Sequence, residues 1–299
     1  MKNKLINNGF DKAFDIINHV ILTLVFLIVL YPLVYVLSCS FSPAAAVLSG
    51  KVWLWPVGFT LDGYTAVFSH HLIISGFLNS IFYTGVGTAI NLFMTVLAAY
   101  PLSRKDFYGR NAIMFLFVFT MLFNGGLIPN YMLMKDIGLI HKWWVLVIPV
   151  ALSAWNVIVT RTYFQNTIPV ELLEAAQIDG CNDFKFVWRM VLPLSKPILA
   201  VMGLFYCVGH WNSYFSALIY INDTRLYPLQ LVLRSILVSN QVDMSMLQHI
   251  DAKELAQKLN ASELLKYSLI VVSSVPVLAL YPFVQKHFIK GMMIGSLKG

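Results

Sequence analysis

Long uncharged apolar runs are the feature that most limits what this chain can fold into. They occupy roughly residues 17–41, 76–102, 112–134, 143–160, 197–221 and 265–285. A helix needs about 20 apolar residues to cross the ~30 Å hydrocarbon core of a bilayer. The chain is also 58% hydrophobic, whereas soluble domains contain about 45–50% apolar residues. We therefore predict an all-α, multi-pass membrane protein with six transmembrane helices.

The positions of lysine and arginine predict the orientation of these helices. More than half of the 21 basic residues fall in the two end segments and in two of the loops. They are Lys2, Lys4, Lys12, Arg104, Lys105, Arg110, Arg161, Lys185, Arg189, Lys196, Lys286, Lys290 and Lys298. Short segments rich in these residues stay in the cytoplasm, so both termini are predicted to be cytoplasmic. The net charge of +7 then reflects topology and does not indicate a nucleic-acid partner.

The predicted organisation is one six-helix transmembrane domain, 17–286, between cytoplasmic tails 1–16 and 287–299. A polar insert at 165–196 and a long external loop at 222–264 interrupt it. The loop is either a docking surface for an external partner or a solvated helix. The first apolar run exceeds the 7–15-residue core of a signal peptide, so we expect it to be retained as a helix.

Several function classes lack their motifs in this sequence. The Gly50-Lys51 pair has no phosphate-loop context, and no hydrolase or metal-ligand pattern is present. The apolar runs hold almost no ionisable side chain except His210, whereas ion-coupled carriers need buried charges along the path. We therefore expect a chain that is not an enzyme and that binds no cofactor itself.

Neutral polar and aromatic residues inside the runs are candidates for a translocation pathway. They are Asn124, Asn130, Tyr131, His210, Trp211, Asn212 and Tyr214. Polar groups are costly when they face lipid, and helical spacing would place His210, Trp211 and Tyr214 on one face. Such a face suits a sugar, which has apolar C–H faces and hydroxyl edges. Hydrogen bonds between helices are the open alternative.

The polar insert is predicted to form two short helices. Pro169 suits a first helical turn, acidic residues suit the helix start, and Gly180 suits its end, which gives a helix over about 169–179. Ala175 and Ala176 would let another surface approach closely, so this helix is expected to serve contact and not a core. A second helix is expected from Asn182 to a stop at Leu192-Pro193. Its apolar stripe could lie on the membrane surface or belong to a plain surface loop.

The insert also carries a resemblance. Glu174-Ala175-Ala176, Gly180, Met190 and Leu192-Pro193 are similar to the E-A-A-x3-G-x9-I-x-L-P signature of ABC importer membrane subunits, with Met190 in place of the usual isoleucine. The segments "GGLIPNYMLMKDIGLI", "WNSYFSALIY" and "KHFIKGMMIGSLKG" resemble the carbohydrate-uptake type, above all its complex-oligosaccharide branch. The likeness covers essentially residues 12–299.

The resemblance implies a type I ABC importer transmembrane domain with a cytoplasmic coupling helix, in the bacterial cell membrane. The implied partners are a second homologous permease, two copies of an ABC ATPase that bind ATP and Mg, and an extracytoplasmic solute-binding protein. The implied coupling residues are Glu174, Ala175, Ala176, Asp179, Gly180, Leu192 and Pro193. The predicted function is oligosaccharide import. Alternatives are another small solute, a stand-alone sugar facilitator or an enzyme acting on lipid-linked sugars.

Overall fold

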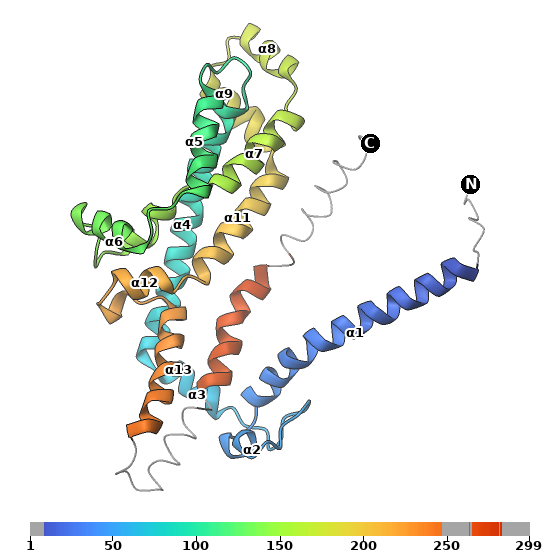
Figure 1. Cartoon of the computed structure of the whole chain (residues 1–299), viewed down its shortest axis with the longest axis vertical. Helices are drawn as coiled ribbons and strands as arrows, with labels where there is room; N and C mark the ends of the chain where they lie inside the picture. Colours follow the sequence, from blue (N-terminus) through green and yellow to red (C-terminus); the bar gives the residue numbers. More distant parts are fainter. Residues whose placement is uncertain (1–8, 247–262, 264, 281, 283–299) are drawn as a thin grey trace. The chain divides into compact units, whose positions relative to one another are not determined.

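The computed structural model describes residues 9–246, 263, 265–280 and 282. It divides into two compact units, which we treat separately: residues 1–70 with 235–272, and residues 71–234 with 273–299. The described residues form helices, turns and loops, and Figure 1 shows their order along the chain. The predicted tail 287–299 lies outside the described residues, as do half of the tail 1–16 and part of the loop 222–264.

The first unit is built around α1, Gly9–Ser40. Its side chains are exposed around the whole circumference over most of its length, as expected for a helix whose surroundings are lipid or another membrane chain. Two short helices follow, α2 at Ala44–Leu48 and α3 at Asp62–Ser69. Trp53 and Trp55 between them are 69% and 81% exposed, which suits residues at a membrane interface.

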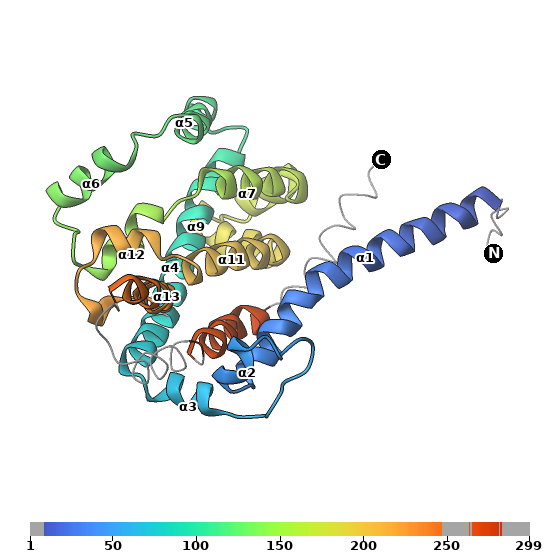
Figure 2. The same cartoon turned by 60° about the horizontal axis from the view of Figure 1, so that its bottom comes forward.

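The second unit contains α4, His71–Ser103, which packs against α7, Ala154–Thr167, and α11, Lys196–Trp211. Both views show α7 and α11 beside α4 (Figures 1 and 2). The other elements are α5 at Arg110–Leu122, α6 at Leu127–Asp136, η1 at Trp143–Leu146, η2 at Ile148–Val150, α12 at Phe215–Tyr220 and η4 at Thr224–Leu226. The helices α13, Leu229–Met246, and Leu265–Leu280 each contribute residues to both units.

The polar insert, residues 165–196, holds four short helical pieces. They are α8 at Val170–Ile178, α9 at Asp183–Phe186, a π-helical segment η3 at Val187–Val191 and α10 at Leu192–Leu194. Buried residues from the insert, including Ala176, Phe186 and Val191, share one hydrophobic cluster with α4, α7 and α11. The insert is therefore packed onto the helices that it connects.

Several of the predicted spans are bent. Among the described residues, two helices are long and apolar enough to cross a membrane, Lys12–Ser40 and His71–Ser103, and up to five spans result if each bent pair counts as one. The bends measure 117° between α5 and α6, 46° between Trp143–Val150 and α7, and 83° between Asp183–Leu194 and α11. The helical class is confirmed, whereas the number six and the sidedness of the termini stay predictions.

Candidate functional site

The first helix of the polar insert forms as its sequence predicts. Pro169 is the N-cap, with φ −62° and ψ 145°, and Glu171 lies in the first turn. Gly180 follows the helix with φ +72°, a left-handed conformation that glycine adopts at low cost. Its N–H donates to the Gln177 carbonyl at 3.0 Å, and that of Cys181 donates to the Ala176 carbonyl at 2.8 Å. The helix therefore has a defined start and a sharp end.

The two faces of α8 have different surroundings. Leu172, Leu173 and Ala176 pack into the hydrophobic cluster of the unit. The exposed face carries Glu171, Glu174, Ala175 and Ile178, which follow the i, i+3, i+4, i+7 spacing of one helix face. The expectation that both alanines form an outward contact surface is wrong for Ala176, which is 7% exposed.

Ile178 also belongs to this face, although it was not among the predicted contact residues. The Ile178 side chain is 87% exposed, although it is large and apolar. The i, i+4 spacing from Glu174 could have indicated it. Asp179 and Gly180 are also exposed, so the end of α8 presents an apolar side chain next to an acidic residue and a tight turn.

The second part of the insert begins as predicted and ends later. The Asn182 side chain accepts a hydrogen bond from the Lys185 backbone N–H at 2.9 Å, which caps α9. Leu192-Pro193 does not stop the helical path, which continues to Leu194 and bends at Ser195. Proline has no N–H for the carbonyl four residues earlier, and the wider π-helical turn lies directly before it.

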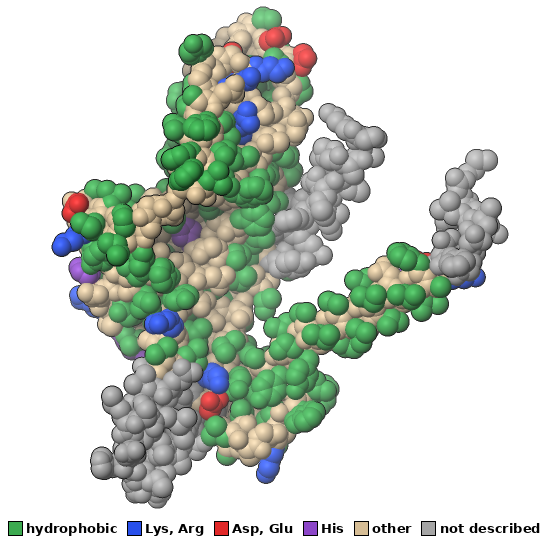
Figure 3. All heavy atoms as spheres, viewed as in Figure 1, with side chains coloured by type: hydrophobic (Ala, Val, Ile, Leu, Met, Phe, Trp, Pro, Cys, Tyr) green, Lys and Arg blue, Asp and Glu red, His purple; other side chains and the backbone are tan. Residues whose placement is uncertain are grey.

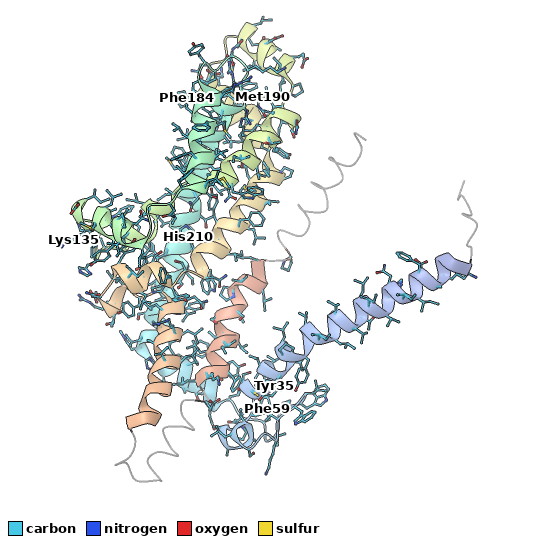
Figure 4. The ribbon with its side chains drawn as sticks, viewed as in Figure 1. Tyr35, Phe59, Lys135, Phe184, Met190 and His210 are labelled. Atoms are coloured by element: carbon cyan, nitrogen blue, oxygen red, sulfur yellow. The ribbon has the colours of Figure 1, made fainter. Side chains whose placement is uncertain are left out.

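The predicted apolar stripe of this second part is divided. Phe184 and Trp188 are 82% and 73% exposed, whereas Val191 is fully buried. The side-chain view labels Phe184 at the same end of the unit as α8 (Figure 4). Charged side chains also gather at this end (Figure 3). Exposed aromatic residues next to Lys185 and Arg189 fit a surface that meets lipid headgroups.

The predicted pathway residues lie on several elements. The break between α5 and α6 contains Asn124, whose Oδ1 accepts from the Gly126 N–H at 2.8 Å and from Asn130 Nδ2 at 3.5 Å. Gly126 there has φ +84°. On α6, the Tyr131 ring stacks on Tyr220 of α12 with ring centroids 6.0 Å apart. These contacts hold α6 at its bend and against α12.

His210 forms a polar contact between helices. Its Nε2 lies 2.6 Å from Asn91 Oδ1 on α4, and Asn91 Nδ2 donates to the Val150 carbonyl at 2.5 Å. Asn91 therefore joins α4 to both α11 and η2, and the label in Figure 4 marks His210 at this level. Gly87 lies against the imidazole ring. His210 therefore takes part in a hydrogen bond between helices, which was the alternative to a role in the pathway.

We expect Gly87→Ala to destabilise the unit. A Cβ at Gly87 would lie 2.5 Å from His210 Nε2, so the ring would have to move, and overpacking of this kind costs about 1–3 kcal/mol. A clearly lower thermal midpoint of the purified variant in detergent is the expected result. Gly85→Ala is the matched control, because no atom lies within 4 Å of a Cβ there. Equal midpoints for the two variants would contradict the packing role.

Trp211 and Tyr214 do not share a helix face, contrary to the sequence expectation. α11 ends at Trp211, and α12 starts at Phe215 after a break. Trp211 is 3% exposed, and its Nε1 donates to the Ser273 carbonyl at 2.9 Å. Asn212 and Tyr214 in the break are exposed. The predicted stripe therefore divides into a packing residue and an exposed polar corner.

Similarity to known proteins decides the family. Residues 73–294 match the family described as "Binding-protein-dependent transport system inner membrane component". The chain belongs to this family. Members of this transport family are non-catalytic membrane subunits of ABC importers, and the partner ATPase handles ATP. The resemblance stated from the sequence is confirmed.

Individual members of the family extend the match over nearly the whole chain. The polygalacturonan/rhamnogalacturonan transport system permease protein YtcP of Bacillus subtilis is 42% identical over 97% of this chain and 99% of its own length. Protein LplC of the same organism is 41% identical over 98% and 97%. A solved bacterial ABC transporter that imports the acidic polysaccharide alginate is 35% identical, with a TM-score of 0.85 over 94% of this chain and 98% of that one.

Proposed function

We propose that the chain forms half of the translocation pathway of an ATP-driven importer of oligosaccharides. The relatives support this substrate class, since one is named for transport of polygalacturonan and rhamnogalacturonan and a solved relative imports the acidic polysaccharide alginate. Family members in general work with a second permease, an ATPase and a solute-binding protein. We infer one homologous permease, two ATPase copies that bind ATP and Mg, and an extracytoplasmic binding protein.

The exposed face of α8 is the observation that carries the coupling role. The chain has no phosphate-loop sequence of its own, so nucleotide energy has to reach it through a contact. The face combines the carboxylate of Glu174, the small Ala175 and the exposed Ile178. An exposed apolar side chain beside a carboxylate and a small residue can serve as an anchor for a partner that covers this face. We infer that an ATPase covers this face and that the coupling insert is cytoplasmic.

The predicted pathway residues fall into two groups, exposed residues and residues that hold neighbouring helices together. Asn124, Asn130, Tyr131, Asn212 and Tyr214 offer amide and aromatic groups at the two helix breaks. We infer that they face the sugar, since irregular backbone at membrane depth is tolerated where it lines a cavity. His210 and Trp211 keep the neighbouring helices in place through their hydrogen bonds to Asn91 and Ser273.

We expect Ile178→Ala to weaken association with the ATPase. Removal of an apolar side chain from the centre of an interface typically costs about 1–2 kcal/mol, or roughly tenfold in affinity. The measurement is the dissociation constant of the purified ATPase for the permease pair in nanodiscs. Phe184→Ala is the control, because Phe184 is equally exposed in the same insert and is assigned to lipid. A larger effect from Phe184→Ala would contradict the assignment.

Uptake of labelled oligosaccharides by cells with and without the complex tests the substrate class. The panel contains galacturonan, alginate and neutral glucan fragments together with monosaccharides. We expect ATP-dependent uptake of oligosaccharides and little uptake of monosaccharides. Uptake of only another small solute would contradict the oligosaccharide assignment while leaving the family membership intact. Uptake that continues without the ATPase would identify a stand-alone facilitator.

A further inference from the structure

Arg104 connects the end of α4 to the coupling insert. It directly follows α4 and is 12% exposed at its side chain. Its Nε donates to Asp106 Oδ1 at 2.8 Å, and its Nη1 donates both to the Tyr100 hydroxyl at 3.0 Å and to Asp183 Oδ1. The Tyr100 hydroxyl in turn donates to Asp183 Oδ1 at 3.2 Å. One guanidinium therefore joins α4, the loop after it and the first residue of α9.

The Arg104 guanidinium keeps its positive charge in this contact. Hydrogen bonding with Asp106 raises the pKa of Arg104, and the same bond from Arg104 lowers the pKa of Asp106. Arginine is charged at all physiological pH values in any case.

α8 lies next to this contact but leaves space beside α4. A cavity of about 420 Å³ opens between them, lined among others by Tyr100, Arg104, Leu173 and Glu174. The ion pair between the end of α4 and the insert is formed with Asp183 of α9 and not with a residue of α8. A force on α8 is transmitted to α9 through the short turn at Gly180–Cys181.

A movement of α4 would reach the other helices of the unit. It packs against both α7 and α11, and its Asn91 holds His210 and the Val150 carbonyl farther along the helix. The insert is continuous in the chain with α7 and α11 but not with α4. Besides the Arg104 contact, α4 is tied to α7 and the insert by hydrophobic packing and by two hydrogen bonds to its last carbonyls. Arg161 Nε donates to the Leu102 carbonyl at 2.8 Å, and Gln165 Nε2 donates to the Ser103 carbonyl at 3.4 Å.

We propose that Arg104 is a positioning residue that transmits movement of the coupling insert to α4 through Asp183. The inference rests on the proposed coupling role of the insert. It assigns α4 to the set of helices that the ATPase moves directly. Loss of the contact leaves intact the exposed face of α8 that we assign to the ATPase, called the docking face below. ATP hydrolysis therefore continues, while fewer hydrolysis cycles move the sugar.

The test is the number of ATP molecules hydrolysed per oligosaccharide imported, measured in proteoliposomes with the whole complex. Asp183→Asn removes the contact with the insert. Asp106→Asn is the matched control, because the two carboxylates have similar exposure, 62% and 65%, and Asp106 belongs to the same loop as Arg104. A single exposed charge pair makes a modest contribution, so we expect about a threefold higher ratio for Asp183→Asn. We expect a wild-type ratio for Asp106→Asn.

Two further variants complete the test. Asp183→Glu keeps the carboxylate and is expected to restore a ratio near that of the wild type. Arg104→Lys carries the test if Asp183→Asn does not assemble, because lysine lacks the planar fork that reaches three partners. The number of ATP molecules hydrolysed per oligosaccharide imported is then expected to lie above that of the wild type but below threefold.

Wild-type ratios in Asp183→Asn, or in Arg104→Lys where that variant carries the test, would overturn the proposal. Equal increases in Asp183→Asn and Asp106→Asn would also overturn it. Failure of the underlying coupling role has a different signature: Glu174→Arg would then leave both hydrolysis and uptake unchanged. If Glu174→Arg abolishes uptake while Asp183→Asn behaves as the wild type, the Arg104 link alone is wrong.

Discussion

Glu174→Arg is expected to abolish oligosaccharide uptake by the assembled transporter. Glu174 is exposed on the docking face of α8, so the substitution changes the charge of the interface while leaving the core of the unit unaltered. A like-charge contact in an interface costs several kcal/mol, which corresponds to about a hundredfold loss or more. Uptake of labelled oligosaccharide and ATP hydrolysis stimulated by the binding protein are the two measurements.

The control for this reversal is Asp136→Arg. Asp136 is also an exposed carboxylate at the end of a short helix, α6, but it belongs to the predicted external side. A basic residue at a helix C-terminus is favourable, so the variant should fold and transport normally. Wild-type uptake and stimulated hydrolysis in Glu174→Arg would contradict the coupling role of α8.

Gly180→Pro is also expected to lower uptake strongly, for a different reason. Gly180 has φ +72°, whereas proline is fixed near −65°, so the turn between α8 and α9 cannot form as it stands. The docking face would then no longer be held relative to Asn182 and the rest of the insert. We expect uptake to fall by about tenfold or more, since backbone strain of this kind costs about 1–3 kcal/mol.

Gly180→Asn separates backbone conformation from other effects. Asparagine tolerates the left-handed conformation better than other residues with a side chain, and no atom lies within 4 Å of a Cβ at Gly180. We expect its uptake to lie within about twofold of the wild type, because the residual strain is well below 1 kcal/mol. Equal losses in Gly180→Asn and Gly180→Pro would show that the conformation of the turn is not the cause.

Apolar length and the chemistry of single residues were enough to predict several helices and their ends. The helix α1 and the helix α4 follow from their uncharged length. The start of α8 at Pro169, its end before Gly180 and the cap at Asn182 follow from the chemistry of single residues. The glycine pair at 125–126 is a local signal for the break between α5 and α6, although the bend of 117° goes with the packing of Tyr131 on α6 against Tyr220 on α12.

Features that depend on tertiary contacts were not predictable in this way. Nothing in the pattern of residues 197–221 separates α11 from α12, because the break after Trp211 contains neither glycine nor proline. Ala176 is buried because Leu172 and Leu173 face the same cluster, and the helix pattern alone does not say which face meets the core. From the sequence, Arg104 contributes only to the predicted orientation of the helices. Its contact with Asp183 could not be predicted, because the two residues are 79 positions apart.

Purification of the tagged chain from its native membrane shows whether it works as one subunit of an ATP-driven importer. We expect an ATPase and a second, homologous permease to be recovered with it in fixed proportions, two ATPase copies to one of each permease. We also expect Glu174→Arg to lower the recovery of the ATPase but not that of the second permease. Recovery of the chain alone, in a form that conducts oligosaccharides without ATP, would contradict its assignment as a subunit that an ATPase drives.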